Sequence, residues 1–185
     1  MKKIGIILAF IGLVLPALSQ ESGNRYYMSF FAKHYQVSIL NYENEGYCVK
    51  MDLESSNTAA TAELYVKYAN LPNFIINMEI IKSQFAKYMK QAVNDNARSM
   101  EIKLDSWFKR NFIIYKTRTH IYQDDGIKMK AYFEVKDDGQ CIAVIESPTF
   151  KAPKSHTVAE TNSFIIFQTV DEFDDFINVL KKFEK

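Results

Sequence analysis

Apolar and polar residues alternate over several short stretches of this chain. The alternation is clearest over 34–42, 47–53 and 127–135. A period of two places successive side chains on opposite faces, so it predicts strands with one face toward a core. Polar turns that end in glycine separate these stretches, as in Glu43-Asn44-Glu45-Gly46. Such turns are typical of hairpins, and the pattern therefore predicts antiparallel pairing.

Two longer stretches follow a different period. From Phe74 to Ala92 apolar residues recur at steps of four, three, four, three and four, which is the spacing of an amphipathic helix. A shorter stripe runs from Val170 to Leu180. It follows Thr169 and Glu172, which have the spacing of a capping box. The chain is thus expected to contain two helices, each after a group of strands.

The two halves of the chain resemble each other. Its only cysteines, Cys48 in EGYCVKM and Cys141 in DGQCIAV, are 93 residues apart, and each follows a glycine by two positions. We therefore predict two copies of a β-β-β-β-α unit, residues 25–96 and 110–185, joined by a connector at 97–109. One such unit cannot bury its sheet face alone. The expected fold class is α+β, a single two-layer domain with one antiparallel sheet and the helices packed on one face.

The first 19 residues have the composition of a signal peptide. Lys2 and Lys3 precede an apolar run, and Ala17 and Ser19 are small residues before a cleavage point at Gln20. The run is shorter than the ~20 apolar residues needed to cross a bilayer. We therefore expect residues 20–185 to be exported as a soluble periplasmic or extracellular protein without a membrane span.

Charge further narrows the expected partners. Without Lys2 and Lys3 the chain has 21 basic and 22 acidic residues. Phosphate backbones are bound by strongly basic surfaces, which a nearly neutral chain does not suggest. We therefore predict that nucleic acid is not a partner.

The predicted strands also suggest a binding face. A hairpin register in which Leu40 faces Val49 would put both residues, with Phe133 and Ile142, on the side of the helices. The cysteines would then lie on the opposite face. Aromatic and apolar side chains on an uncovered sheet face favour binding, although the connector or a dimer partner could equally cover it. The ligand-binding candidates on this face are Tyr35, Val37, Ile39, Tyr132 and Glu134.

No residue pattern in the chain indicates catalysis or metal binding. The three histidines are scattered, and neither cysteine has a second ligand at metal-binding spacing. We therefore expect no catalytic residue, cofactor or metal. Cys48 and Cys141 could form a disulfide if their strands lie beside the axis relating the two repeats; otherwise they are free thiols.

The function that these observations favour is an exported binding module. It would act through the aromatic sheet face or through the long loop at 147–162, on a protein, a glycan or an apolar ligand. Two alternatives stay open: an envelope enzyme of hydrolase-like or redox type, and a structural subunit that assembles through the open sheet face, for example as a homodimer.

Overall fold

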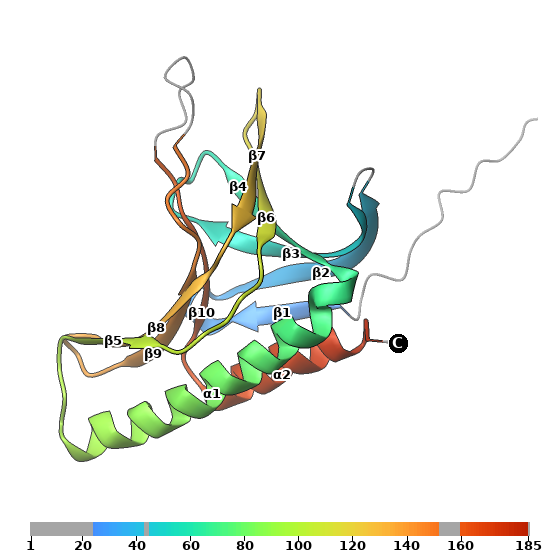
Figure 1. The fold of residues 1–185 in the computed structure, drawn as a ribbon. Helices are drawn as coiled ribbons and strands as arrows, with labels where there is room; N and C mark the ends of the chain where they lie inside the picture. The colour runs from blue at the N-terminus through green and yellow to red at the C-terminus, as the bar shows by residue number, and fades with distance from the viewer. Residues whose placement is uncertain (1–23, 43–44, 152–159, 185) are drawn as a thin grey trace, which may run out of the picture.

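A computed structural model of the chain describes residues 24–42, 45–151 and 160–184. Within these ranges the protein combines a large antiparallel sheet with two α-helices, which confirms the predicted α+β class (Figure 1). Short 3-10 helices, Ser29–Phe31 and Tyr68–Asn70, follow β1 and β4. The elements are β1 (Arg25–Met28), β2 (Lys33–Tyr42), β3 (Gly46–Ser55), β4 (Thr61–Lys67), α1 (Leu71–Asn94), β5 (Met100–Leu104), β6 (Asn111–Lys116), β7 (Ile121–Ile127), β8 (Lys130–Val135), β9 (Cys141–Glu146), β10 (Ser163–Phe167) and α2 (Val170–Lys181).

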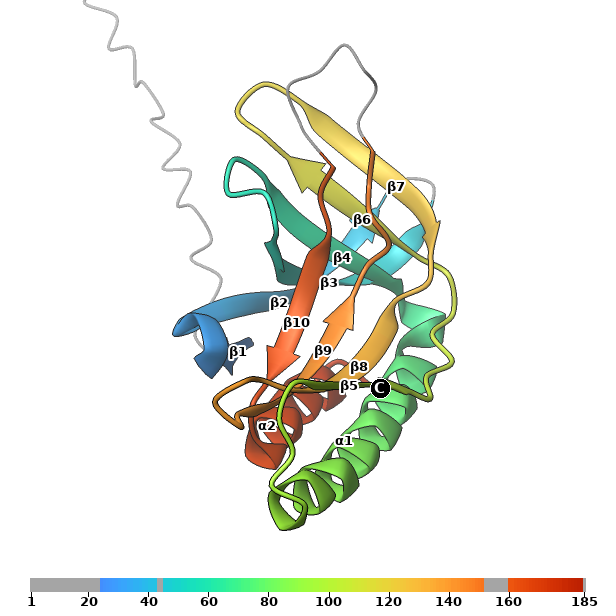
Figure 2. The same cartoon turned by 90° about the vertical axis from the view of Figure 1, so that its left-hand side faces the viewer.

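The strands form one continuous but divided sheet, with the order β5-β8-β9-β10-β3-β4-β6-β7. Strand β3 joins its two parts. Most of β3 pairs with β2 and β4, whereas its last residues, Glu54 and Ser55, pair with β10. Strand β1 pairs only with β2. Both helices lie side by side beneath the sheet (Figures 1 and 2).

The main core lies between the helices and the sheet. The stripe predicted on α1 is buried, and the ring of Phe85 lies 5.9 Å from that of Phe133 on β8. On α2, the ring of Phe173 lies 4.0 Å from that of Phe167 on β10. The predicted capping box is present, because the side chain of Thr169 accepts a hydrogen bond from the Glu172 amide at 3.2 Å. Local sequence patterns therefore predicted both helices correctly.

The register of the β2–β3 hairpin differs from the prediction by one residue. Tyr42 pairs with Gly46, so three residues connect the strands instead of four, and Gly46 takes a positive φ of 72°. A shift of one residue reverses the face of every side chain in a strand. Tyr35 and Val37 are consequently only 2% exposed and lie in the main core. Their predicted place on the open face is wrong.

The two cysteines lie on opposite sides of the sheet and are free. Cys48 packs with Tyr65 and Phe112 on the face away from the helices. Cys141 instead pairs with Val135 and packs against the main core. Ile142, predicted to face the helices, belongs to a separate cluster with Val144 and Ile166. The disulfide alternative is therefore wrong in this structure, and the internal duplication is not confirmed.

Two predictions concern parts of the chain outside the described residues. The signal peptide at 1–19 is one, and residues 152–159 of the proposed binding loop are the other. In the part of the chain that is described, neither helix is long and apolar enough to cross a membrane.

Candidate functional site

A groove of about 790 Å³ lies beside residues 105–110, which link β5 to β6 and are called the connector from here on. Two neighbouring segments complete its wall: the start of α1 and the junction between β7 and β8. Pockets of this size hold ligands the size of a small organic molecule or a short oligomer. The lining residues are Asn70, Lys103, Ser106, Trp107, Phe108, Lys109, Arg110, Lys128, Met129 and Lys130.

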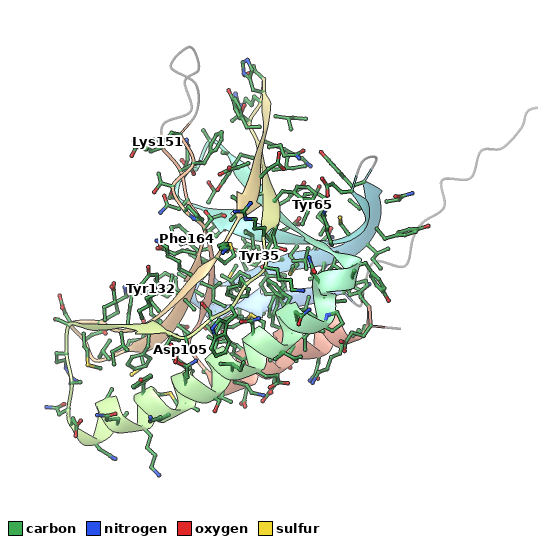
Figure 3. The ribbon with its side chains drawn as sticks, in the orientation of Figure 1. Tyr35, Tyr65, Asp105, Tyr132, Lys151 and Phe164 are labelled. Carbon is green, nitrogen blue, oxygen red and sulfur yellow. The ribbon has the colours of Figure 1, made fainter. Side chains whose placement is uncertain are left out.

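Two amide side chains of α1 hold the connector in place. Asn77 accepts a hydrogen bond from the Trp107 amide at 2.5 Å and donates to the Trp107 carbonyl at 3.3 Å. About two helical turns later, Gln84 makes the same pair of bonds with Asp105, both at 3.0 Å. Figure 3 shows Asp105 beside α1. The extended backbone of 105–107 is thus bonded to the helix much as a strand is bonded to its neighbour.

This anchoring fixes an exposed tryptophan at the edge of the groove. Phe108 points inward, and its ring lies 5.2 Å from that of Phe74 in the core. Trp107 points outward and is 67% exposed. It is the only tryptophan of the chain. A large aromatic ring held on a fixed backbone can contact a ligand at little cost in conformational entropy.

The charges around the groove have one sign. Five of the ten lining residues are cations, and none is a carboxylate. None of the five forms an ion pair with a described residue. Positive charges gathered in a concave surface attract anions. The cations are Lys103 on β5, Lys109 and Arg110 on the connector, and Lys128 and Lys130 at the β7–β8 junction.

Acidic side chains lie next to the groove but outside it. Lys130 is paired across the sheet with Glu146. The pKa of Glu146 is raised above its usual value, mainly because the carboxyl is partly buried. The charge of Lys130 lowers this pKa, whereas the charges of Glu101 and Glu134 add to the increase. The positive groove is therefore bordered by a negative region on the same side of the sheet.

The predicted binding residues are not brought together. Tyr35 and Val37 are buried, whereas Ile39 on β2 is 38% exposed on the same side as Val49. Tyr132 is half-buried on β8. Three strands, β9, β10 and β3, lie between β8 and β2 in the sheet. Figure 3 shows Tyr132 well away from Tyr35. Glu134 is bonded to Lys136 at 2.5 Å and lines a separate hollow of about 510 Å³.

A different set of aromatic side chains, none of them among the predicted binding residues, packs on the sheet face away from the helices. Tyr65 and Phe112 stack with their ring centres 4.8 Å apart, over the buried thiol of Cys48. Beside them the Tyr65 hydroxyl donates to Glu63 at 2.8 Å. Burial would raise the pKa of Glu63, but hydrogen bonds from Lys116 and Tyr65 and the charge of Lys50 lower it overall. This face therefore has a structural role in the described chain.

Sequence reasoning missed the groove because three separate segments form it. The cluster of Lys103, Lys109 and Arg110 around the only tryptophan was a usable signal. Lys128 and Lys130 could be added only from the tertiary structure. Among the residues described here, no group of three or more His, Cys, Asp or Glu side chains could hold a metal ion.

Comparison with protein-family models, with curated proteins and with solved structures gives no match to this chain, so its function has to be inferred from the groove itself.

Proposed function

We propose that this chain is an exported binding module that holds an anionic ligand in the groove beside Trp107. The observation that carries the proposal is the set of five cations around the groove, with no carboxylate among the lining residues. The predicted signal peptide supports export. The proposal keeps the binding role expected from the sequence but moves it from the aromatic sheet face to the groove.

An unoccupied cluster of cations is unfavourable for the folded protein. Lys128 and Lys130 are two positions apart at the junction between β7 and β8. Two unit charges about 7 Å apart repel each other by about 0.6 kcal/mol in water, and by more near a protein surface. A bound anion would offset this repulsion for several lysines at once. Selection for binding therefore explains the cluster better than selection for stability does.

The chemistry of the lining residues favours binding over catalysis. The groove offers charged groups, an amide, a hydroxyl and an aromatic ring, and no histidine or carboxylate lines it. A hydrolytic or redox role would need a base and a nucleophile held within hydrogen-bond reach, or a redox group. The groove residues are better suited to holding a ligand than to transforming it.

We also keep the internal duplication as a proposal about the architecture of residues 20–185. In its favour, β2–β4 before α1 and β8–β10 before α2 are both antiparallel runs of three consecutive strands. Against it, α1 has 24 residues and α2 has 12, and the two cysteines face opposite ways.

The intrinsic fluorescence of Trp107 tests the binding proposal. Inorganic polyphosphate is titrated into the mature chain, and a saturable change in emission is expected at low salt. If all five cations contact the polyanion, the affinity should fall by about 100-fold between 50 and 200 mM salt. If neither the emission of Trp107 nor the heat of a calorimetric titration changes at low salt, the proposal is refuted.

A pair of charge reversals tests the location of the site. Lys109→Glu with Lys128→Glu should weaken polyphosphate binding at least tenfold. The matched control is Lys87→Glu with Lys90→Glu on α1, which changes the net charge equally at exposed lysines outside the groove. Equal losses in the two double variants would show that only net charge matters and would contradict a site in the groove.

A further inference from the structure

We infer that the anionic ligand is an acidic glycan, with a sugar ring lying on Trp107 and its carboxylate, sulfate or phosphate groups on the surrounding cations. This inference rests on the proposed anion-binding function. It adds a ligand class, and the groove supports that class through its aromatic ring, its neutral polar groups and the spacing of its charges.

The aromatic ring provides the first argument. A sugar ring presents a face of C–H groups, and an indole offers a flat apolar surface with a polar N–H at its edge. Trp107 is 67% exposed, and its backbone N–H and C=O are both hydrogen-bonded to the side chain of Asn77. A ligand consisting only of charged groups would have no use for this ring. A ligand built of sugar rings would gain both apolar contact and orientation from it.

Neutral polar side chains provide the second argument. Asn70 and Ser106 line the groove together with the cations. Asn70 occupies the N-cap position of α1, yet its side chain makes no capping hydrogen bond. Its amide is therefore not engaged by the helix end that it precedes. An amide and a hydroxyl beside an aromatic ring are suited to sugar hydroxyl groups, which both donate and accept hydrogen bonds.

The spacing of the cations provides the third argument. They come from three segments and are spread along the groove instead of converging on one point. Lys103 pairs across the sheet with Tyr132, two positions from Lys130, so these two lysines are diagonal neighbours about 7–8 Å apart. One small anion could reach only part of this set. An oligomer with acidic groups on separate units could reach most of it.

Single-stranded nucleic acid fits the groove less well. Proteins that bind it stack several successive bases on several aromatic side chains. Among the groove residues, Trp107 is the only exposed ring, because Phe108 is 5% exposed. Glu146, which pairs across the sheet with Lys130, lies at the border of the groove and would repel a backbone with a charge on every unit. A glycan can place uncharged sugars over that border.

An anionic membrane surface fits less well for a related reason. Interfacial binding usually combines cations with several apolar side chains that enter the lipid. Phe108 and Met129 are only 5% and 3% exposed and cannot insert while they remain in the core. The exposed carboxylate of Asp105, two residues from Trp107, would also face the lipid head groups.

Calorimetric titration of the mature chain with defined probes tests the inference. The probes are a tetrasaccharide of uronic acid, the same tetrasaccharide with its carboxylates reduced, inorganic polyphosphate, a hexamer of single-stranded DNA, and vesicles containing phosphatidylglycerol. We expect the acidic tetrasaccharide to bind at least tenfold more tightly than its reduced form. It should also bind more tightly than the DNA hexamer or the vesicles. Stronger binding of DNA or vesicles would overturn the inference.

The variant Trp107→Leu separates the sugar contact from the charge contact. It should weaken the acidic tetrasaccharide about tenfold and leave polyphosphate binding within twofold, with an unchanged circular dichroism spectrum. Equal effects on both ligands would contradict stacking on Trp107. If polyphosphate binds and the acidic tetrasaccharide does not, the glycan inference fails while anion binding stands. If neither binds, both proposals fail.

Discussion

The anchoring of Trp107 by Asn77 leads to a quantitative prediction. Asn77→Ala removes both hydrogen bonds that join α1 to the Trp107 backbone. Asn77 is 5% exposed and lies on the otherwise apolar face of the helix. A polar side chain at such a position needs partners, and the connector supplies them. The variant should therefore loosen the connector without disturbing the packing of α1 on the sheet.

The expected loss follows from the two bonds. A hydrogen bond in a folded protein contributes about 1 kcal/mol net to stability. The cost is larger if the Trp107 amide and carbonyl stay buried without a partner, because water cannot replace Asn77 there. The free energy of unfolding should therefore fall by about 2 kcal/mol. For a domain of this size that corresponds to a decrease in Tm of about 6 °C. Alanine has a higher helix propensity than asparagine, so this effect alone would stabilise the variant. A decrease in the free energy of unfolding therefore cannot come from helix propensity.

Urea unfolding followed by circular dichroism measures this loss, and the fluorescence anisotropy of Trp107 measures local mobility. We expect lower stability together with lower anisotropy. The control is Asn73→Ala, one turn earlier on the same helix, where the side chain is exposed. A loss below about 0.5 kcal/mol, or the same loss in both variants, would refute the anchoring role of Asn77.

Three further predictions concern the cap of α2, the charge network and the thiols. Thr169→Ala removes the N-cap acceptor of α2 and should cost about 1 kcal/mol in urea unfolding, whereas Thr169→Ser should cost much less. Because the folded pKa of Glu63 is lowered, its contribution to stability is present above the unfolded pKa near 4.5 and is lost as the pH falls through the folded value. Glu63→Gln should therefore reduce the difference in unfolding free energy between pH 7 and about pH 3.5, and an unchanged difference would contradict the assignment. Unreduced, denatured protein should contain two free thiols by colorimetric titration, and the buried Cys48 should react only after unfolding; a count of zero would mean that the cysteines are bridged.

Features that depend on neighbouring residues were predictable from the sequence. The spacing of apolar residues on α1 and the capping box of α2 are both local, and both appear as expected. Strand pairing depends on a finer detail. One residue fewer in the β2–β3 connection moved Tyr35 and Val37 from the predicted open face into the core. Periodicity predicts which side chains share a face, but turn geometry decides which face that is.

The candidate site could not be predicted from patterns among neighbouring residues. The apolar pattern of residues 97–110 does not decide between two elements, because Met100, Ile102 and Leu104 fit a strand while Met100, Leu104, Trp107 and Phe108 fit a helix face. The connector is in fact held by side chains of α1, which no pattern within it indicates. Its charge also becomes notable only when Lys128 and Lys130 lie beside it. The near-zero net charge of the whole chain concealed this local cluster.

Chemical-shift mapping of the ligand contacts tests the central claim most directly. Residues 20–185 are labelled with ¹⁵N and titrated with the uronic acid tetrasaccharide, and the signals of the backbone amides and of the single indole N–H are followed. The account predicts that the indole signal and the amides of 106–110 and 128–130 shift most, with saturation at one common Kd. Shifts centred on Ile39, on Tyr132 or on the loop at 147–162, with an unmoved indole signal, would contradict it.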